Sequence, residues 1–96
     1  MAEQRPPAIP LYRAHKIVRA AKITMIDRFQ EKVHFCFEVG QGSFICGHEE
    51  LLHKPEPRVG MYLIQYVDQQ NTDVLTYFSF SPALEFEEGY SKVENA

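Results

Sequence analysis

The sequence predicts a small α+β domain in which a twisted antiparallel sheet of about five strands packs against one short C-terminal helix. Three observations support this fold class. The chain has 96 residues, enough for one small domain, and 45% of them are apolar, as in ordinary globular proteins. Short runs rich in β-branched and aromatic residues alternate with segments rich in glycine, proline or polar residues, which is typical of strands joined by turns. A segment with helix-start and helix-end residues lies near the C-terminus.

We expect a single domain bounded by two short terminal segments. The first ten residues, MAEQRPPAIP, contain three prolines, so residues 1–11 are predicted to form a flexible arm. Residues 12–91 are predicted to form the β-rich domain, and residues 92–96 a tail. The sequence has no apolar run of transmembrane length and no signal-peptide segment near Met1, so a cytoplasmic location is expected.

The segment HKIVRAAKITMI, residues 15–26, fits either a helix or a strand. Lys16, Arg19 and Lys22 continue a three-residue spacing that begins at Arg13, as on the solvent-exposed face of a helix. Its β-branched residues favour a strand, which is our prediction. In a strand, Arg13 and Arg19 share one face and could hold a phosphate or an acidic partner. Alternatively, the cations of this segment protect an edge strand against aggregation.

The segment HFCFEVGQGSFICGH, residues 34–48, is predicted to form a β-hairpin. Apolar and polar residues alternate along its first half, and the GQG tripeptide fits a three-residue loop with Gly42 in the left-handed region. This loop sets the register between the two strands. The expected opposite pairs are Val39 with Ser43, Phe37 with Ile45, Cys36 with Cys46, and His34 with His48.

This register would place two cysteines and two histidines on one face of the hairpin. Thiolates and imidazoles are ligands that zinc prefers, so a Cys2His2 site is one alternative. The spacing is not that of a standard zinc signature, and cysteine is common as a small buried apolar residue. We therefore predict no metal and no cofactor, and free thiols rather than a disulfide in a reducing compartment. The ligands of the alternative site would be His34, Cys36, Cys46 and His48.

Two further strands are predicted in the C-terminal half, MYLIQYV at residues 61–67 and VLTYFSF at residues 74–80. The first strand has apolar residues on both faces, which indicates a sheet that is covered on both sides. One face carries Tyr62, Ile64 and Tyr66, and the other carries Met61, Leu63 and Val67. We expect the C-terminal helix to cover one side and a second subunit to cover the other, which predicts a homo-oligomer.

The helix is predicted at residues 82–88. Ser81 suits the N-cap, Pro82 the first helical position, and Gly89 the residue after the last turn. Ala83, Phe86 and Tyr90 would share the face that lies on the sheet.

The sequence predicts binding rather than catalysis. It contains no nucleophile elbow, H-E-x-x-H, Walker A or dinucleotide glycine motif, so we predict that the protein is not an enzyme. A net charge of −3 argues against sequence-independent nucleic-acid binding. Tyrosines on adjacent strands suit either a core, a protein interface or stacking on a ligand. The candidate partner- or ligand-binding residues are Arg13, Arg19, Tyr62, Tyr66 and Tyr77.

The C-terminal third, VGMYLIQYVD…DVLTYFSFSPALEFEEGY, resembles a signature of small accessory proteins of tailed phages and prophages. In that signature a G-Y-φ-φ-x-Y strand is followed by an aromatic-Ser-φ-Ser-Pro strand and a helix ending F-E-x-G-Y. The segment HKIVRAAKI is similar to the opening strand of the same proteins. Here the longer loop DQQNTD replaces their usual Asp-Gly turn, and HFCFEVGQGSFICGH has no counterpart in them.

The resemblance implies a phage-encoded protein that binds and neutralises a component of the bacterial host, acting on a defence pathway by protein–protein interaction. A weaker likeness to signal-sequestering phage proteins implies an alternative, an oligomeric sponge that holds a cyclic nucleotide against Arg13 or Arg19. A small metal-binding module is the third expectation.

Overall fold

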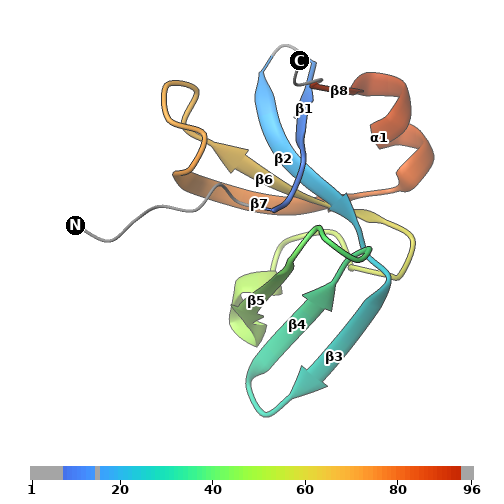
Figure 1. Cartoon of the computed structure of the whole chain (residues 1–96). Helices are drawn as coiled ribbons and strands as arrows, with labels where there is room; N and C mark the ends of the chain where they lie inside the picture. The colour runs from blue at the N-terminus through green and yellow to red at the C-terminus, as the bar shows by residue number, and fades with distance from the viewer. Residues whose placement is uncertain (1–7, 15, 94–96) are drawn as a thin grey trace.

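The computed structural model describes residues 8–14 and 16–93, which form two antiparallel sheets, one α-helix and one 3-10 turn (Figure 1). Eight strands are present in these residues. The elements are β1 (Leu11–Arg13), β2 (Ile17–Lys22), β3 (Met25–Phe29), β4 (Lys32–Cys36), β5 (Ser43–Gly47), η1 (His48–Leu51), β6 (Tyr62–Val67), β7 (Leu75–Ser81), α1 (Ala83–Gly89) and β8 (Ser91–Lys92).

The strands divide into a five-stranded sheet, ordered β7-β6-β2-β1-β8, and a three-stranded sheet, ordered β3-β4-β5. The prediction of an antiparallel β domain with one C-terminal helix is confirmed. The prediction of a single sheet of about five strands was wrong, because residues 15–26 do not form one strand. Ile23 N donates to Met61 O at 2.8 Å beside the larger sheet, and Thr24 N donates to Cys36 O at 2.8 Å in the smaller one. The chain therefore changes sheets between Ile23 and Thr24.

The two sheets pack face to face around the main core. Leu63 of β6 and Phe35 of β4 are completely buried and contribute to this core from opposite sheets. The outer face of the larger sheet is covered by α1, which forms a second cluster with Val18, Tyr62 and Ile64. The expectation that a second subunit covers one face of this sheet was wrong, since the chain covers both faces itself. The homo-oligomer stays a prediction without that support.

Helix α1 begins at Ala83, one residue later than predicted, because Ser81 belongs to the end of β7 and does not cap the helix with its side chain. The predicted apolar face is confirmed. Phe86 is buried and stacks on Tyr62 and Tyr90, with ring centroids 4.3 Å and 4.5 Å away. This aromatic stack fixes the helix on β6 and on the chain end that follows α1.

The β4–β5 hairpin has a different register from the predicted one. Cys36 is paired with Ser43, three residues from the expected partner Cys46, because the connection spans residues 37–42 rather than three residues. Gly42 has φ +81°, which confirms its left-handed conformation, and Gly40 also has positive φ. An odd register shift moves side chains to the opposite face of a strand. Cys46 therefore faces the core, whereas Cys36 lies on the outer face.

Both ends of the domain extend beyond the predicted limits. Ile9 is buried in the main core and β1 begins at Leu11, so the described part of the predicted arm belongs to the domain. Lys92 of the predicted tail is in β8, and Val93 N donates to Leu11 O at 2.9 Å. Residues 1–7 of the arm and 94–96 of the tail lie outside the described residues. Within the described ranges, the structure contains no helix with the length and apolarity needed to cross a membrane.

Candidate functional site

Strand β7 is an edge of the larger sheet, and its first half is irregular. Its pairing with β6 shifts between Tyr66 and Val67, so Thr76 is an extra residue with no partner in the ladder. The Thr76 hydroxyl donates to Tyr66 O at 2.9 Å, which fixes this β-bulge. A bulge increases the local twist of a strand and turns its edge away from regular pairing.

A groove of about 390 Å³ borders β7 on the side of the smaller sheet, and we call it the edge groove. Its rims come from β5 and from β7, so it lies where the edge strands of the two sheets come close together. Tyr77 and Leu75 on its rim are about half exposed, and Val74 precedes them with similar exposure. The groove is lined by Phe44, Glu50, Lys54, Leu75, Thr76, Tyr77 and Phe78.

Lys54 crosses the edge of β7 at this groove. Its Nζ atom lies 3.8 Å from the centroid of the Tyr77 ring and 4.5 Å from that of Phe78, although these rings point to opposite faces of the strand. These cation–π contacts hold the ammonium in place. Among the described residues no carboxylate pairs with it, since the two ion pairs found there join other cations. Glu50, the acidic residue of the groove, accepts the Gly47 N–H at 2.9 Å.

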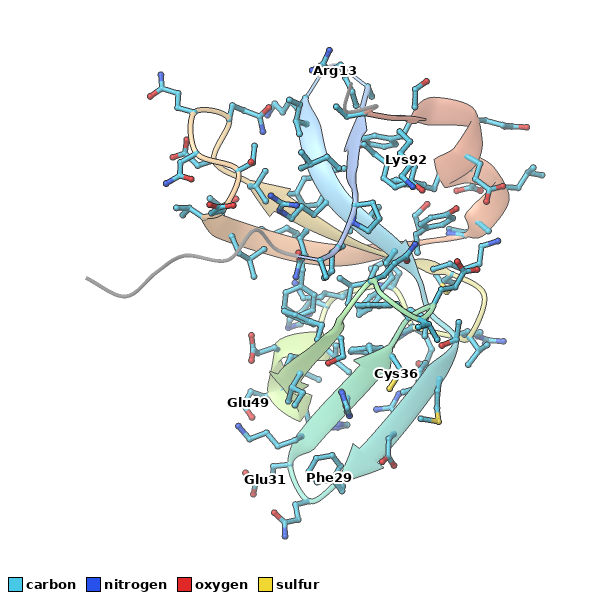
Figure 2. All side chains as sticks on the ribbon, in the orientation of Figure 1. Arg13, Phe29, Glu31, Cys36, Glu49 and Lys92 are labelled. Atoms are coloured by element: carbon cyan, nitrogen blue, oxygen red, sulfur yellow. The ribbon has the colours of Figure 1, made fainter. Side chains whose placement is uncertain are left out.

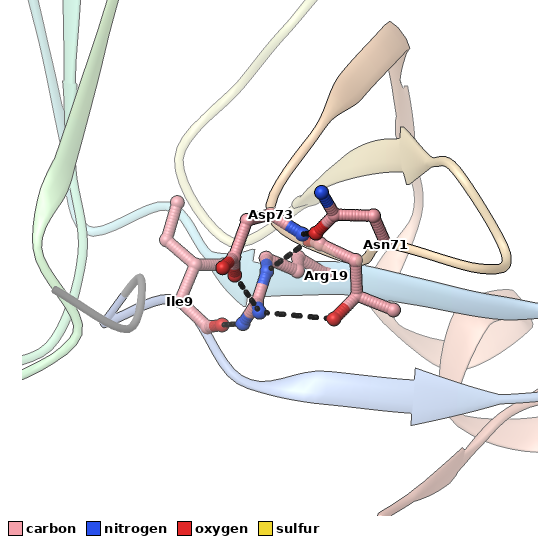
Figure 3. A network of polar contacts seen from close by, with 5 residues as sticks. Ile9, Arg19, Asn71 and Asp73 are labelled. Atoms are coloured by element: carbon pink, nitrogen blue, oxygen red, sulfur yellow. Dashed lines mark hydrogen bonds and ion pairs between the residues drawn. The ribbon is translucent and has the colours of Figure 1, made fainter. Parts of the chain in front are cut away.

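A second hollow of about 300 Å³ lies on the inner face of the larger sheet, and we call it the Arg19 hollow. Arg19 is only 7% exposed and donates to three residues in two parts of the chain, the segment before β1 and the β6–β7 loop (Figure 3). Its Nη1 donates to Ile9 O at 2.9 Å, its Nε donates to Thr72 O at 3.0 Å, and its Nη2 lies 3.3 Å from an Asp73 carboxylate oxygen. Asn71 in turn accepts the Asp73 N–H at 3.1 Å.

These contacts make Arg19 a clamp between β2, the β6–β7 loop and the segment before β1. Burial lowers the pKa of its guanidinium, and the neighbouring Asp73 carboxylate partly opposes that shift. The guanidinium remains charged because its ordinary pKa is far above neutrality. Its donors are directed to the chain itself rather than to the solvent.

The structure brings together only part of the predicted binding set. Tyr66 and Tyr77 are neighbours, with ring centroids 5.9 Å apart, and Tyr77 reaches the edge groove. Burial raises the pKa of the partly exposed Tyr66. Tyr62 is buried under α1, where its hydroxyl donates to a Glu87 carboxylate oxygen at 2.8 Å. Arg13 is exposed at the far end of the β1–β2 hairpin, away from the groove (Figure 2).

The predicted alternative metal ligands do not converge. His34 and Cys36 lie on the outer face of the smaller sheet, opposite to the buried Val33 and Phe35, whereas Cys46 is 4% exposed in the core. His48 begins η1. No group of three or more histidine, cysteine or acidic residues suited to one ion occurs among the described residues. The hairpin arrangement of these four ligands was therefore a wrong prediction, caused by the wrong register.

The two cysteines are free thiols on opposite faces of the hairpin. Burial, followed by the nearby Glu50 charge, raises the pKa of the Cys46 thiol. A raised pKa disfavours the thiolate, which is the nucleophilic form of cysteine. Cys46 therefore has the properties of a core residue rather than those of an activated nucleophile.

Sequence reasoning did not identify Lys54 or the edge of β5. Lys54 is a single cation in the polar segment HKPEP, and nothing in that segment signals that it will fold across β7. The β5 segment SFICG did contain a signal, since it has no charged residue and no proline, unlike a protected edge strand. That signal could be used only after β5 was known to be an edge.

No protein-family model matches the chain, no curated protein matches its sequence, and no solved structure matches its fold.

Proposed function

We propose that this chain is a non-enzymatic protein that acts by binding a partner protein in the edge groove. The observation that supports this most directly is the exposed Tyr77, which forms the rim of the groove together with Leu75 and lies under the charge of Lys54, which has no carboxylate partner among the described residues. Partly exposed tyrosines beside a concave apolar surface are typical anchors of protein interfaces. The groove combines such an anchor with a cation that can select a complementary charge.

We further propose that the partner is a component of a bacterial host, which a phage-encoded protein neutralises by occupying it. This part of the proposal rests on the resemblance of the C-terminal strands and helix to phage accessory proteins. It places the protein in the cytoplasm of an infected cell and its target in a defence pathway.

The alternative proposal, a sponge for a cyclic nucleotide, depends on Arg13 or Arg19. Three of the contacts of Arg19 are with its own chain, so a phosphate would have to displace Asp73 or a backbone carbonyl. Arg13 is exposed and is not part of either hollow. The geometry therefore supports the sponge less well than it supports a protein partner.

The proposal is tested by affinity capture from bacterial lysate with three forms of the chain, followed by calorimetry with the purified captured protein. We expect the wild type to capture one protein in stoichiometric amount, and Tyr77→Ala to weaken its binding by about 2 kcal/mol or more, as for an interface anchor. Leu84→Ala is the matched control, because Leu84 is 68% exposed but lies on α1. Equal binding by Tyr77→Ala and Leu84→Ala would contradict the proposal.

A further inference from the structure

The described strands have four sheet edges, and three of them are protected against pairing with another chain. Strand β7 has a bulge and Lys54 across it, β8 has only two residues and includes Lys92, and β3 contains Asp27 and Arg28. Bulges, short length and charges are the usual protections of edge strands. Strand β5 has none of these features, since it reads Ser-Phe-Ile-Cys-Gly over five regularly paired residues.

The register shows which backbone groups of β5 face outward. His48 N donates to Glu31 O at 2.8 Å, so His48 and Glu31 form a hydrogen-bonded pair at the end of the β4–β5 ladder. Residues of an antiparallel strand alternate between bonding the partner and pointing away from it. Gly47, Ile45 and Ser43 therefore point away from β4. The Gly47 N–H donates to the Glu50 carboxylate, as expected for a group that points away from β4. Ile45, in the middle of the strand, is 53% exposed.

The edge groove borders β5 at Phe44, which lies between Ser43 and Ile45, whereas Ser43 itself lines the Arg19 hollow. Phe44 points inward from β5 and contacts Phe78 of β7, with ring centroids 4.9 Å apart, and both residues line the groove. A strand added along β5 would lie about 4.8 Å away, with alternate side chains facing the same way as Phe44. Those inward side chains would enter the groove between β5 and β7, beside Tyr77 and Lys54.

We propose that the partner presents an extended segment that pairs with the edge of β5 and places one carboxylate side chain against Lys54. This inference rests on the proposed function, because it specifies how a protein partner enters the same groove. Addition of a strand to a sheet edge is an established mode of peptide recognition, in which backbone bonds give affinity and pockets for alternate side chains give specificity. Here the backbone bonds come from Ile45 and Ser43, and the selective pocket is the edge groove.

The charge of Lys54 favours a different protein over a second copy of this chain as the occupant. Pairing of two β5 strands about Ile45 would be possible sterically, since Ser43 would then face Gly47. However, β5 contains no acidic residue, so a second β5 strand would bring no carboxylate to Lys54 from its own sequence. An acidic segment would supply a carboxylate to Lys54, because Glu50, which also lines the groove, accepts the Gly47 N–H and forms no ion pair with Lys54.

The probe for this inference is a capped peptide, acetyl-Thr-Val-Thr-Glu-Thr-Val-Thr-amide, whose valines and glutamate share one face of a strand. We expect saturable shifts of the Ser43 and Ile45 amide resonances, and slowing of Ile45 amide exchange by about tenfold or more at saturation because this N–H becomes bonded. The same peptide with lysine in place of glutamate should bind about tenfold more weakly to the wild type, and this difference should shrink to about threefold or less in Lys54→Met.

Ile45→Pro and Ile45→Ala separate the backbone bond from the side chain. Both variants lose the isoleucine side chain, but only proline also lacks the outward N–H, and edge strands tolerate proline where the N–H faces the solvent. We expect peptide binding to fall about tenfold in Ile45→Pro relative to Ile45→Ala. If Ile45→Pro does not fold, the amide exchange of the wild type decides the question alone.

Absence of any β5 amide response to the glutamate peptide at millimolar concentration would overturn the inference, and so would equal binding of the glutamate and lysine peptides. Sedimentation of the unliganded chain as a dimer with a protected Ile45 amide would show a second copy as the occupant and would also overturn it. Failure of the proposed function can be distinguished from failure of strand addition. A captured protein that requires Tyr77 but not the Ile45 N–H would refute strand addition alone, whereas peptide binding without any captured protein would refute the proposed function alone.

Discussion

The two hollows beside β7 each contain one cation, but the two cations have different partners. Arg19 is almost fully buried and bonds Ile9, Thr72 and Asp73, which belong to its own chain. Lys54 lies over two aromatic rings and has no carboxylate partner among the described residues. A cation whose donors are bonded to its own chain therefore stabilises the fold, whereas a cation of equal charge without such acceptors is available to a partner.

The largest expected effect is the loss of stability in Arg19→Met. The substitution removes the donors to the carbonyls of Ile9 and Thr72, of which the bond to Ile9 is buried and the bond to Thr72 is partly buried. We expect the free energy of unfolding to fall by about 2–4 kcal/mol in urea denaturation. Asp73 contributes the smaller share, because its side chain is 39% exposed. Arg13→Met is the control and should change stability by less than about 0.5 kcal/mol, as at other exposed sites.

A loss below about 1 kcal/mol in Arg19→Met would contradict the structural role of Arg19, since its bonds would then be dispensable to the fold. Such a result would also reopen the cyclic-nucleotide proposal, because the guanidinium could turn to a ligand at little cost.

Lys54→Met should have a smaller effect on stability than Arg19→Met, because Lys54 does not bond the backbone of its own chain. The variant keeps the apolar stem over the rings and loses only the cation–π attraction, so we expect a change of about 0.5–1 kcal/mol in urea denaturation. Lys54→Arg retains the charge over Tyr77 and serves as the matched control. A loss as large as that of Arg19→Met would show that Lys54 is part of the fold rather than a group available to a partner.

The last prediction concerns the Tyr62 hydroxyl, which donates to the exposed Glu87 on the α1 side at 2.8 Å, where Lys22 also pairs with Glu87 at 3.5 Å. The Tyr62 hydroxyl, and secondarily Lys22, lower the pKa of the Glu87 carboxyl from its ordinary value of 4.5. A carboxyl with a lowered folded-state pKa contributes stability that is present above its unfolded pKa and disappears as the pH falls through the folded one. Burial and the bond to Glu87 raise the pKa of Tyr62, so this contribution persists up to alkaline pH.

We therefore expect the stability difference between the wild type and Tyr62→Phe to be constant between about pH 5 and 9 and to shrink below pH 4.5. Urea midpoints measured at several pH values would show this change. A difference that grows on acidification would contradict the assignment, because it would mean that Tyr62 stabilises the protonated form of Glu87.

The predictions from sequence were most accurate where local pattern decides the outcome. The alternation of Tyr62, Leu63 and Ile64 correctly separated the two faces of β6, because successive side chains of a strand point to opposite sides. The spacing of Ala83, Phe86 and Tyr90 correctly oriented α1. Both results follow from backbone geometry, which depends on neighbouring residues only.

The predictions failed where a long-range pairing decides. The hairpin register depended on the length of one loop, and a change from three to six residues placed Cys36 and Cys46 on opposite faces. The change of sheet at Ile23–Thr24 depends on hydrogen bonds to Met61 and Cys36, which are distant in sequence. The candidate site was predicted only in part for the same reason, since Tyr77 was identified but Lys54 was not.

Local pattern in the sequence is sufficient to predict a small, mainly antiparallel β domain with an aromatic helix face, because hydrophobic periodicity and turn residues act over a few positions. The long-range contacts of the folded chain are what divide the strands into two sheets, bond Arg19 internally and bring Lys54 across an edge strand beside β5. These features depend on which distant segments meet, and the free energy of that choice comes from burying Phe35 and Leu63 between the sheets rather than from any local preference.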